Sequence, residues 1–348
     1  MGERSAMPDA TEDVFLGSLL GLAIGDALGM PVAGLTKEEI AAIAGGGHVT
    51  DYLPKTFPDG TVVKAGEFTD ESEMALCIVE SMTTNSGHVD RETIGPRMRF
   101  LARGESKRWL SDATLRALDV TADHDFRVPV DEDGPATADV AARGVPIGLV
   151  HAVGAFSADQ FRADAETVSR ITHSSPAATA AVTAVAFGVQ LAARGEAERS
   201  SWAASTADFL GSGSLAAALH EADHMIGSGA ATADLLSLMQ TGPDASESVP
   251  AAFVAAMTSL RFEDAVPAAV NAGGATDSIG AIAGALAGAA GGVSAIPQEL
   301  IDALEGRIYI SLAAPWFYRG ALRRAGRVID LRPEEGGPWT RPAMPPRV

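Results

Sequence analysis

The sequence predicts an all-α protein, and three observations support this. Apolar residues recur at spacings of three and four through most of the chain, which is the period of an amphipathic helix. Alternation typical of a strand is confined to residues 61–64. Small residues dominate the apolar segments, with 37 glycines and only 5% aromatic residues in the chain. Close helix–helix packing suits this composition better than a β-sandwich, whose strands need β-branched and aromatic residues.

Eight segments show the helical spacing clearly, and they follow one another along the chain. They are residues 14–28, 72–82, 91–101, 137–150, 177–193, 215–226, 249–260 and 279–290. No long linker, charge block or internal repeat divides them, so we expect a single domain over residues 1–330. Residues 331–348 are rich in proline and are expected to form an irregular C-terminal tail.

Charge excludes one large class of function. The 348 residues include 45 acidic and 26 basic side chains, a formal net charge of −19. A surface this acidic repels phosphate backbones, so we expect no nucleic-acid partner. A small anionic ligand is still allowed, because a metal ion or a helix N-terminus can reverse the field locally.

Cysteine content and apolar runs bound the environment of the protein. Cys77 is the one cysteine, which excludes an intrachain disulfide, and its apolar surroundings indicate a buried core thiol. The apolar run at residues 15–24 follows an acidic rather than a basic segment, which argues against an export signal. Residues 279–293 are too few and too small to span a membrane. We therefore expect a cytoplasmic protein with no membrane partner.

Two loops place Thr-Asp at the start of an apolar helix, at residues 66–72 and 271–278. Each allows a capping interpretation, with Asp70 and Glu73 as a capping box and Asp277 or Thr276 as an N-cap. Taken together, the two loops could instead converge into a cage of oxygen ligands. Such hard ligands suit magnesium or manganese and not zinc. Spacing alone leaves both interpretations open.

Five ordered motifs resemble those of the ADP-ribosylglycohydrolases, which include the ADP-ribosylarginine hydrolases. The motifs lie at residues 21–31, 66–74, 172–176, 247–251 and 271–284, and the resemblance extends over about residues 12 to 305. It implies a compact orthogonal bundle of helices with a central cleft that holds two magnesium ions. It also implies hydrolysis of an N- or O-glycosidic bond at the anomeric carbon of ADP-ribose.

The resemblance also assigns site residues. The metal ligands that it implies are Thr69, Asp70, Glu71, Asp277 and Ser278, with Glu71 standing where the family has its second aspartate. Of these, Asp70, Glu71 and Asp277 would stabilise the charge that develops at the anomeric carbon. Substrate contacts fall on His173, Asn271, Gly273 and Gly274. The expected cofactor is one or two Mg²⁺ ions, which Mn²⁺ could replace.

Departures from the family pattern are equally specific. Ala275 replaces the first aspartate of the second loop, and Ala33 falls where many members have a glutamate. Residues 138–143 lack the Asn-Gly whose backbone lies against the ribose in the family. A magnesium ion depends on charged oxygens to offset its dehydration, so each lost carboxylate is expected to weaken the site.

Two further residues each allow two interpretations, and a pair of histidines allows only a structural one. His173 either contacts the ligand or caps the helix that begins near residue 176. Asp26 lies on an otherwise apolar helix and must be hydrogen-bonded if buried, either as a support for the metal loops or for structure alone. His220 and His224 share a helix face without a catalytic glutamate in the right order, which is typical of a solvated face.

We therefore expect a metal-assisted hydrolase of an N-glycosidic bond to ADP-ribose or a related ribosyl or nucleoside substrate. One alternative is a catalytically diverged family member that acts as a ligand-binding or structural protein, which Ala33 and Ala275 favour. Another is an enzyme on a different small ribosyl metabolite that needs fewer metal ions. The retained Thr-Asp and Asp-Ser pairs favour the two enzyme interpretations, because a scaffold needs no polar cluster.

Overall fold

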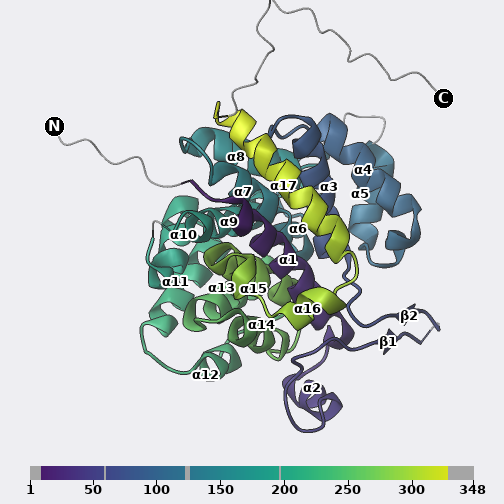
Figure 1. Cartoon of the computed structure of the whole chain (residues 1–348), viewed down its shortest axis with the longest axis vertical. Helices are drawn as coiled ribbons and strands as arrows, with labels where there is room; N and C mark the ends of the chain where they lie inside the picture. The colour runs from purple at the N-terminus through teal and green to yellow at the C-terminus, as the bar shows by residue number, and fades with distance from the viewer. Residues whose placement is uncertain (1–8, 59, 122–125, 196, 328–348) are drawn as a thin grey trace, which may run out of the picture.

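Helices make up almost all of the regular structure in the computed structural model, which describes residues 9–58, 60–121, 126–195 and 197–327 (Figure 1). The all-α prediction is confirmed. The two short strands, β1 (Lys55–Thr56) and β2 (Val62–Val63), pair antiparallel with Lys55 opposite Val63. The strand β2 lies within residues 61–64, the segment whose alternation is typical of a strand. The tail predicted at residues 331–348 lies outside the described residues.

The first half of the described chain contains short and medium-length helices. They are α1 (Glu12–Gly29), η1 (Met30–Val32), α2 (Lys37–Ile43), α3 (Asp70–Thr84), α4 (Arg91–Arg103), η2 (Glu105–Arg108), α5 (Asp112–Thr121), α6 (Ala138–Ala142), α7 (Gly144–His151), α8 (Ala158–Ser169) and α9 (Pro176–Arg194). The segment predicted as one helix over residues 137–150 is therefore two helices. Pro146 has no N–H to donate to the carbonyl of Ala142, where α6 ends.

The second half continues the bundle. Its helices are η3 (Arg199–Ser201), α10 (Trp202–Leu210), α11 (Ser214–Ile226), α12 (Thr232–Ser237), α13 (Ala245–Thr258), α14 (Phe262–Val270), α15 (Thr276–Gly291), η4 (Val293–Ala295), α16 (Gln298–Ala303) and α17 (Arg307–Arg324). Buried apolar side chains from α1 through α17 form one continuous hydrophobic cluster. The helix α17 packs on both α1 and α3 along the outside of the bundle (Figure 1).

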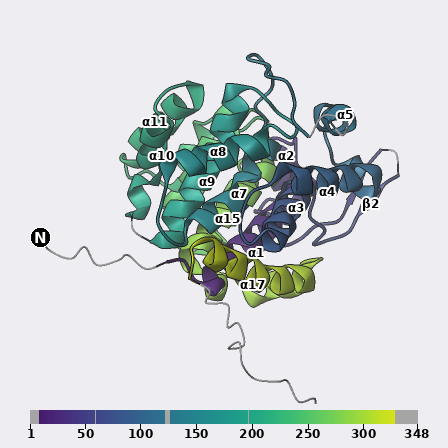
Figure 2. The same cartoon turned by 90° about the horizontal axis from the view of Figure 1, so that it is seen from above.

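The helices α1 and α15 lie in the middle of the bundle (Figure 2), where they run antiparallel and pack backbone against backbone. Glycines repeat every fourth residue along each helix, and the two stripes face each other. They are Gly17, Gly21, Gly25 and Gly29 on α1, with Gly280, Gly284 and Gly288 on α15. A Cβ at Gly21 would lie 2.1 Å from the carbonyl oxygen of Gly284, so no larger residue fits without separating the helices.

This packing brings the end of α1 to the beginning of α15. The Thr276 hydroxyl donates a hydrogen bond of 2.8 Å to the carbonyl of Gly29, where α1 ends. Asp26 lies in the last turn of α1 and Asp277 in the first turn of α15. The glycine stripes therefore place two acidic residues, about 250 positions apart in the sequence, at the same end of the central pair.

Two segments in the described part of the chain, Glu12–Val32 and Pro176–Arg194, are long and apolar enough to cross a membrane by composition alone. In the fold, 89% of the first apolar window and 67% of the second are buried against the rest of the protein. Both segments serve as core helices here, and core helices of soluble proteins pass the same test.

Candidate active site

Asp26 anchors the loop that precedes α3. Its carboxylate is fully buried and accepts four hydrogen bonds from that loop. Thr69 donates its backbone N–H to Oδ2 at 2.9 Å and its hydroxyl to Oδ1 at 2.7 Å. Ser72 donates its backbone N–H to Oδ2 at 3.2 Å and its hydroxyl to the same oxygen at 2.6 Å. Asp26 therefore holds both sides of the first Thr-Asp loop against the end of α1.

These bonds rule out the capping interpretation of the first loop. Thr69 is the N-cap of α3, and its side chain makes no capping hydrogen bond because it turns toward Asp26. Glu73 instead accepts a hydrogen bond of 2.8 Å from the hydroxyl of Ser106. The start of α15 is likewise uncapped by a side chain, since Ala275 occupies its N-cap position.

Glu71 connects the two Thr-Asp loops. Its Oε1 accepts a hydrogen bond of 2.6 Å from the Ser278 hydroxyl, and its Oε2 lies 2.9 Å from the Thr69 hydroxyl. All three side chains are buried. The backbone N–H of Ser278 donates at 2.8 Å to Oδ1 of Asp277, which fixes that carboxylate at the start of α15. The structure thus brings the starts of α3 and α15 together in one polar cluster.

Asp70 has the least engaged carboxylate of the cluster. It is 9% exposed, and within the described residues it accepts no hydrogen bond. Burial raises the pKa of Asp70 well above its ordinary value, and the negative charges of Asp139, Asp26 and Asp277 raise it further. The guanidinium of Arg143 acts in the opposite direction. Asp70 is therefore a buried acid that needs a cation or a proton.

The other carboxylates share this electrostatic pressure. Burial is the main cause that raises the pKa of Glu71 and Asp277, and like charges add to it in both. Burial also raises the pKa of Asp26 to about 7, despite its four hydrogen bonds. Lys55 opposes the rise at Asp277 and is held by a bond of 3.3 Å from its Nζ to the carbonyl of Met30. Negative charge exceeds positive charge throughout the cluster.

Asp139 and Arg143 are site residues that the predicted set of ligands and substrate contacts did not include. Arg143 is fully buried, donates a hydrogen bond to the Thr172 hydroxyl, and lies 3.4 Å from the carboxylate of Asp139. The signal that could have found them is an acid and a base four residues apart in an otherwise apolar segment, which places both on one helix face. Asp139 also stands at a position where the family pattern has glycine.

His173 lies at the edge of the cluster. Its Nδ1 is 2.8 Å from the Thr172 hydroxyl and its Nε2 is 3.4 Å from that of Thr137. Burial, together with the charge of Arg143, lowers the pKa of His173 to about 4. His173 is therefore a neutral imidazole at neutral pH. It does not cap α9, because Ser175 does so by accepting a hydrogen bond from the backbone N–H of Ala178.

Asn271, Gly273 and Gly274 shape the second loop. The Asn271 amide bonds both backbone groups of Val49 at 2.9 Å and the carbonyl of Pro267 at 2.8 Å, so its polar atoms are engaged by the protein. Gly273 and Gly274 have positive φ angles of 84° and 75°. A Cβ at Gly274 would lie 2.0 Å from the carbonyl oxygen of Thr241, so this position admits only glycine.

The two positions that lack a carboxylate lie on neighbouring segments. The backbone N–H of Gly34 donates to the carbonyl of Gly274 at 2.8 Å, and that of Gly274 donates to Leu35 at 2.9 Å. Ala33 and Ala275 adjoin these pairs, and both are partly exposed. The two acidic residues that the family pattern would add are therefore replaced by alanine on one side of the cluster, where the segment after η1 meets the loop before α15.

Residues predicted to be structural behave as expected. Cys77 is buried, and burial raises the pKa of its thiol to about 12, which confirms a core thiol. His220 and His224 are exposed on α11, where His220 lies 3.5 Å from the carboxylate of Asp208. The prediction of a solvated face for this histidine pair is confirmed.

The donor chemistry of the cluster suits a hard divalent cation. Its side-chain oxygens come from Asp70, Glu71 and Asp277 with the hydroxyls of Thr69 and Ser278, and nitrogen and sulfur ligands are not among them. In the part of the chain that the structure describes, no three acidic, histidine or cysteine side chains are close enough together to hold a metal ion as they stand. Magnesium often takes only one or two protein carboxylates and completes its shell with water. Two carboxylates of this cluster with the two hydroxyls therefore still fit a magnesium ion.

Comparison with known proteins agrees with the fold and the motifs. The family model of the ADP-ribosylglycohydrolases matches residues 7–328. The chain therefore belongs to the ADP-ribosylglycohydrolase family, whose members are glycohydrolases. A solved structure described as an ADP-ribosylglycohydrolase-related protein complex superposes with a TM-score of 0.69 at 27% identity. That match covers 89% of this chain and 98% of the other.

Related sequences come from distant organisms. An uncharacterised protein of Archaeoglobus fulgidus is 31% identical over 90% of this chain and 98% of its own length. The Escherichia coli protein YegU is 32% identical over 82% of this chain and 90% of its own. The ADP-ribosylarginine hydrolase Tri1 of Pseudomonas putida is 26% identical over 85% of this chain and 75% of its own.

Proposed function

We propose that this protein hydrolyses an N-glycosidic bond to ADP-ribose, with ADP-ribosylated arginine as the first substrate to test. Membership of the family supports the reaction class. The relative named as an ADP-ribosylarginine hydrolase supports the choice of substrate. The structural observation that carries the proposal is the hydrogen bond from Ser278 to Glu71, which joins the two Thr-Asp loops. Asp70 belongs to the first of these loops, and its carboxylate accepts no hydrogen bond from a described residue.

The chain's own groups account for the chemistry of this reaction. Cleavage of a glycosidic bond develops positive charge at the anomeric carbon, and a cluster of buried carboxylates stabilises that charge. Asp70 is the member with no hydrogen bond from a described residue, so its carboxylate is free to accept a proton from the attacking water. Glu71 and Asp277 are held by Ser278 and supply negative charge in a fixed position.

The cofactor belongs to the same proposal. Asp70 and Asp277, with the hydroxyls of Thr69 and Ser278, would hold a single Mg²⁺ or Mn²⁺ ion, and Glu71 would hold those two hydroxyls in place. A bound ion would orient the ribose hydroxyls and polarise the attacking water. The excess of negative charge supports a cation here, because the charges of Asp26 and Asp277 add to burial in raising the pKa of both Asp70 and Glu71.

A hydrolysis assay tests the proposal. ADP-ribose release from an ADP-ribosylated arginine peptide is measured with and without Mg²⁺ for the wild type, Asp70→Asn and Asp277→Asn. We expect both substitutions to lower kcat/KM by about a hundredfold or more, the size found for loss of an electrostatic catalytic group. Asp159→Asn, on the exposed start of α8, is the matched control and should keep full activity. Equal activity in all four proteins would contradict the proposed site.

A catalytically diverged, ligand-binding protein is the second candidate, favoured by Ala33 and Ala275. Calorimetric titration with ADP-ribose, together with the hydrolysis assay, separates this candidate from the hydrolase. A diverged, ligand-binding protein would bind ADP-ribose but would release none from the ADP-ribosylated peptide. Activity on a small ribosyl metabolite, such as a nucleoside, with no activity on the ADP-ribosyl peptide would instead indicate the third interpretation. In that case the same Asp70 and Asp277 substitutions should still abolish turnover.

A further inference from the structure

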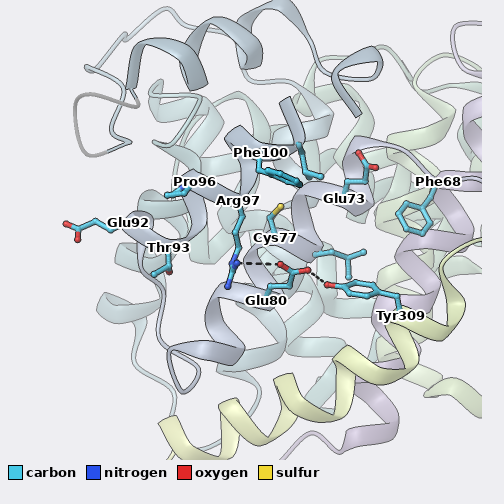
Figure 3. Close-up of a pocket in the computed structure, with 12 residues that line it drawn as sticks. Phe68, Glu73, Cys77, Glu80, Glu92, Thr93, Pro96, Arg97, Phe100 and Tyr309 are labelled. Carbon is cyan, nitrogen blue, oxygen red and sulfur yellow. Dashed lines mark hydrogen bonds and ion pairs between the residues drawn. The ribbon is translucent and has the colours of Figure 1, made fainter. Parts of the chain in front are cut away.

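A cavity outside the acidic cluster lies between α3, α4 and the start of α17 (Figure 3). It has a volume of about 720 Å³, within the range of small-molecule sites. Leu76 and Cys77 of α3, with Pro96 and Leu101 of α4, give it largely apolar walls. Phe100 is 79% exposed, so the cavity borders an exposed aromatic ring. The proposed function leaves this cavity unused.

Two carboxylates lie along the α3 side of this cavity. Glu73 and Glu80 are two helical turns apart, with Leu76 and Cys77 between them. Glu80 is hydrogen-bonded by the Tyr309 hydroxyl and lies 3.7 Å from the guanidinium of Arg97 (Figure 3). Arg97 is the one basic residue among those that line the cavity.

Of the two carboxylates on α3, Glu73 is the one that no charged side chain contacts in the described part of the chain. Its Oε1 accepts the hydroxyl of Ser106, and its Oε2 is buried with no hydrogen-bond partner in the described part of the chain. The guanidinium of Arg108, which could otherwise neutralise Glu73, is paired with Glu67. A buried carboxylate oxygen without a donor is costly, and a ligand that donates to it would recover that cost.

We propose that this cavity binds a small organic cation with an apolar body, an alkyl- or arylalkylammonium compound. The ammonium group would pair with Glu73, and the hydrocarbon part would lie along Leu76 and Leu101 beside the ring of Phe100. An anionic ligand of the same shape is disfavoured, because both carboxylates line α3 and Arg97 already faces Glu80. This site is separate from the proposed active site, because the described residues that line the cavity include none of the proposed metal ligands.

Three probes of similar shape and different charge test the proposal. They are 4-phenylbutylamine, the neutral 4-phenylbutan-1-ol and the anionic 5-phenylpentanoate, each titrated into the full-length protein by calorimetry and by thermal unfolding. The amine should bind and raise the melting temperature, and it should bind at least about tenfold more tightly than the alcohol, the effect of one charge-assisted hydrogen bond. The carboxylate should not bind.

Variants locate the site. Glu73→Gln keeps the shape of the side chain and should weaken amine binding by about tenfold. Glu92→Gln is the matched control, because Glu92 lines the same cavity but points away from its centre (Figure 3). It should bind the amine as the wild type does. Equal weakening in both variants would mean that only the general negative charge attracts the amine, and it would overturn the proposal.

Cys77 gives a second readout that needs no variant. It is the single cysteine of the chain and lines the cavity. Because burial raises the pKa of this thiol, its modification by methyl methanethiosulfonate is slow, and we expect it to slow several-fold further when saturating 4-phenylbutylamine occupies the cavity. Unchanged labelling in the presence of bound amine would place the amine elsewhere and contradict the proposal. Equal binding of all three probes would contradict it as well.

Discussion

The Ser278 hydroxyl lies 2.6 Å from Oε1 of Glu71, although 207 residues separate the two in the sequence. This contact joins the start of α15 to the start of α3. It depends on α1, which packs against α15 through its glycines and holds the first loop through Asp26. The candidate active site is therefore a property of three helices together, and each of them offers a test.

Asp26 should be essential for the position of the first loop. Asp26→Ala leaves the buried backbone N–H groups of Thr69 and Ser72 without an acceptor, so we expect a loss of about 2–4 kcal/mol in the free energy of unfolding. Asp26→Asn keeps one acceptor oxygen and should cost less. Chemical denaturation measures both. A larger loss in the asparagine variant would contradict the supporting role assigned to this carboxylate.

Gly284 should not tolerate alanine. A Cβ there would lie 2.1 Å from the carbonyl oxygen of Gly21, so the substitution must push α1 and α15 apart. We expect Gly284→Ala to destabilise the protein by about 1–3 kcal/mol and to lower activity, because Asp277 moves with α15. Gly227→Ala is the control, since Gly227 is exposed, has φ of −59°, and a Cβ added to it would meet no atom nearer than 3.3 Å. Thermal unfolding should show no loss in the control.

Restoring a carboxylate at Ala275 should strengthen cation binding. Ala275→Asp adds a charged oxygen beside Asp277, so we expect tighter Mg²⁺ binding by calorimetry and a larger rise in melting temperature on adding Mg²⁺. Ala275→Asn is the matched variant. It can also cap α15, a gain of about 1 kcal/mol that is independent of metal, but it adds no charge. An equal response to Mg²⁺ in both variants would assign the effect to capping.

His173 should make the protein less stable in mild acid. Its pKa is about 4 in the folded state and 6.5 in the unfolded chain, so the unfolded state binds more protons between these values. The contribution of neutral His173 to the free energy of unfolding is fully present above pH 6.5 and is lost as the pH falls toward 4. The loss amounts to roughly 3 kcal/mol at the lower end.

Denaturation curves at several pH values measure this effect. His173→Gln should flatten the fall in stability between pH 6.5 and 4, because glutamine takes up no proton. His224→Gln, at an exposed position on α11, should keep the slope of the wild type. Identical slopes in all three proteins would show that His173 is not held neutral in the fold.

The eight predicted helical segments correspond to α1, α3, α4, α6 with α7, α9, α11, α13 and α15, whose apolar faces point to one core. The helices that were not predicted from the sequence are α2, α5, α8, α10, α12, α14, α16 and α17. In α17, Ile308, Leu312 and Trp316 are exposed, so its apolar spacing does not mark a single buried face. The division between α6 and α7 was also missed. The apolar periodicity continues through Pro146, so it does not mark the boundary. The helix is interrupted because proline has no N–H to donate to the carbonyl four residues before it.

Sequence alone determined the all-α class, the family pattern and the two Thr-Asp loops, because helical period and short motifs are local properties of a chain. Only the tertiary structure decided what surrounds those loops. The four hydrogen bonds to Asp26 and the approach of Asp139 and Arg143 to Asp70 join segments far apart in the sequence. These contacts form because the glycine stripes of α1 and α15 let the two helices pack backbone to backbone. No local sequence pattern shows that these two helices are the ones that pair.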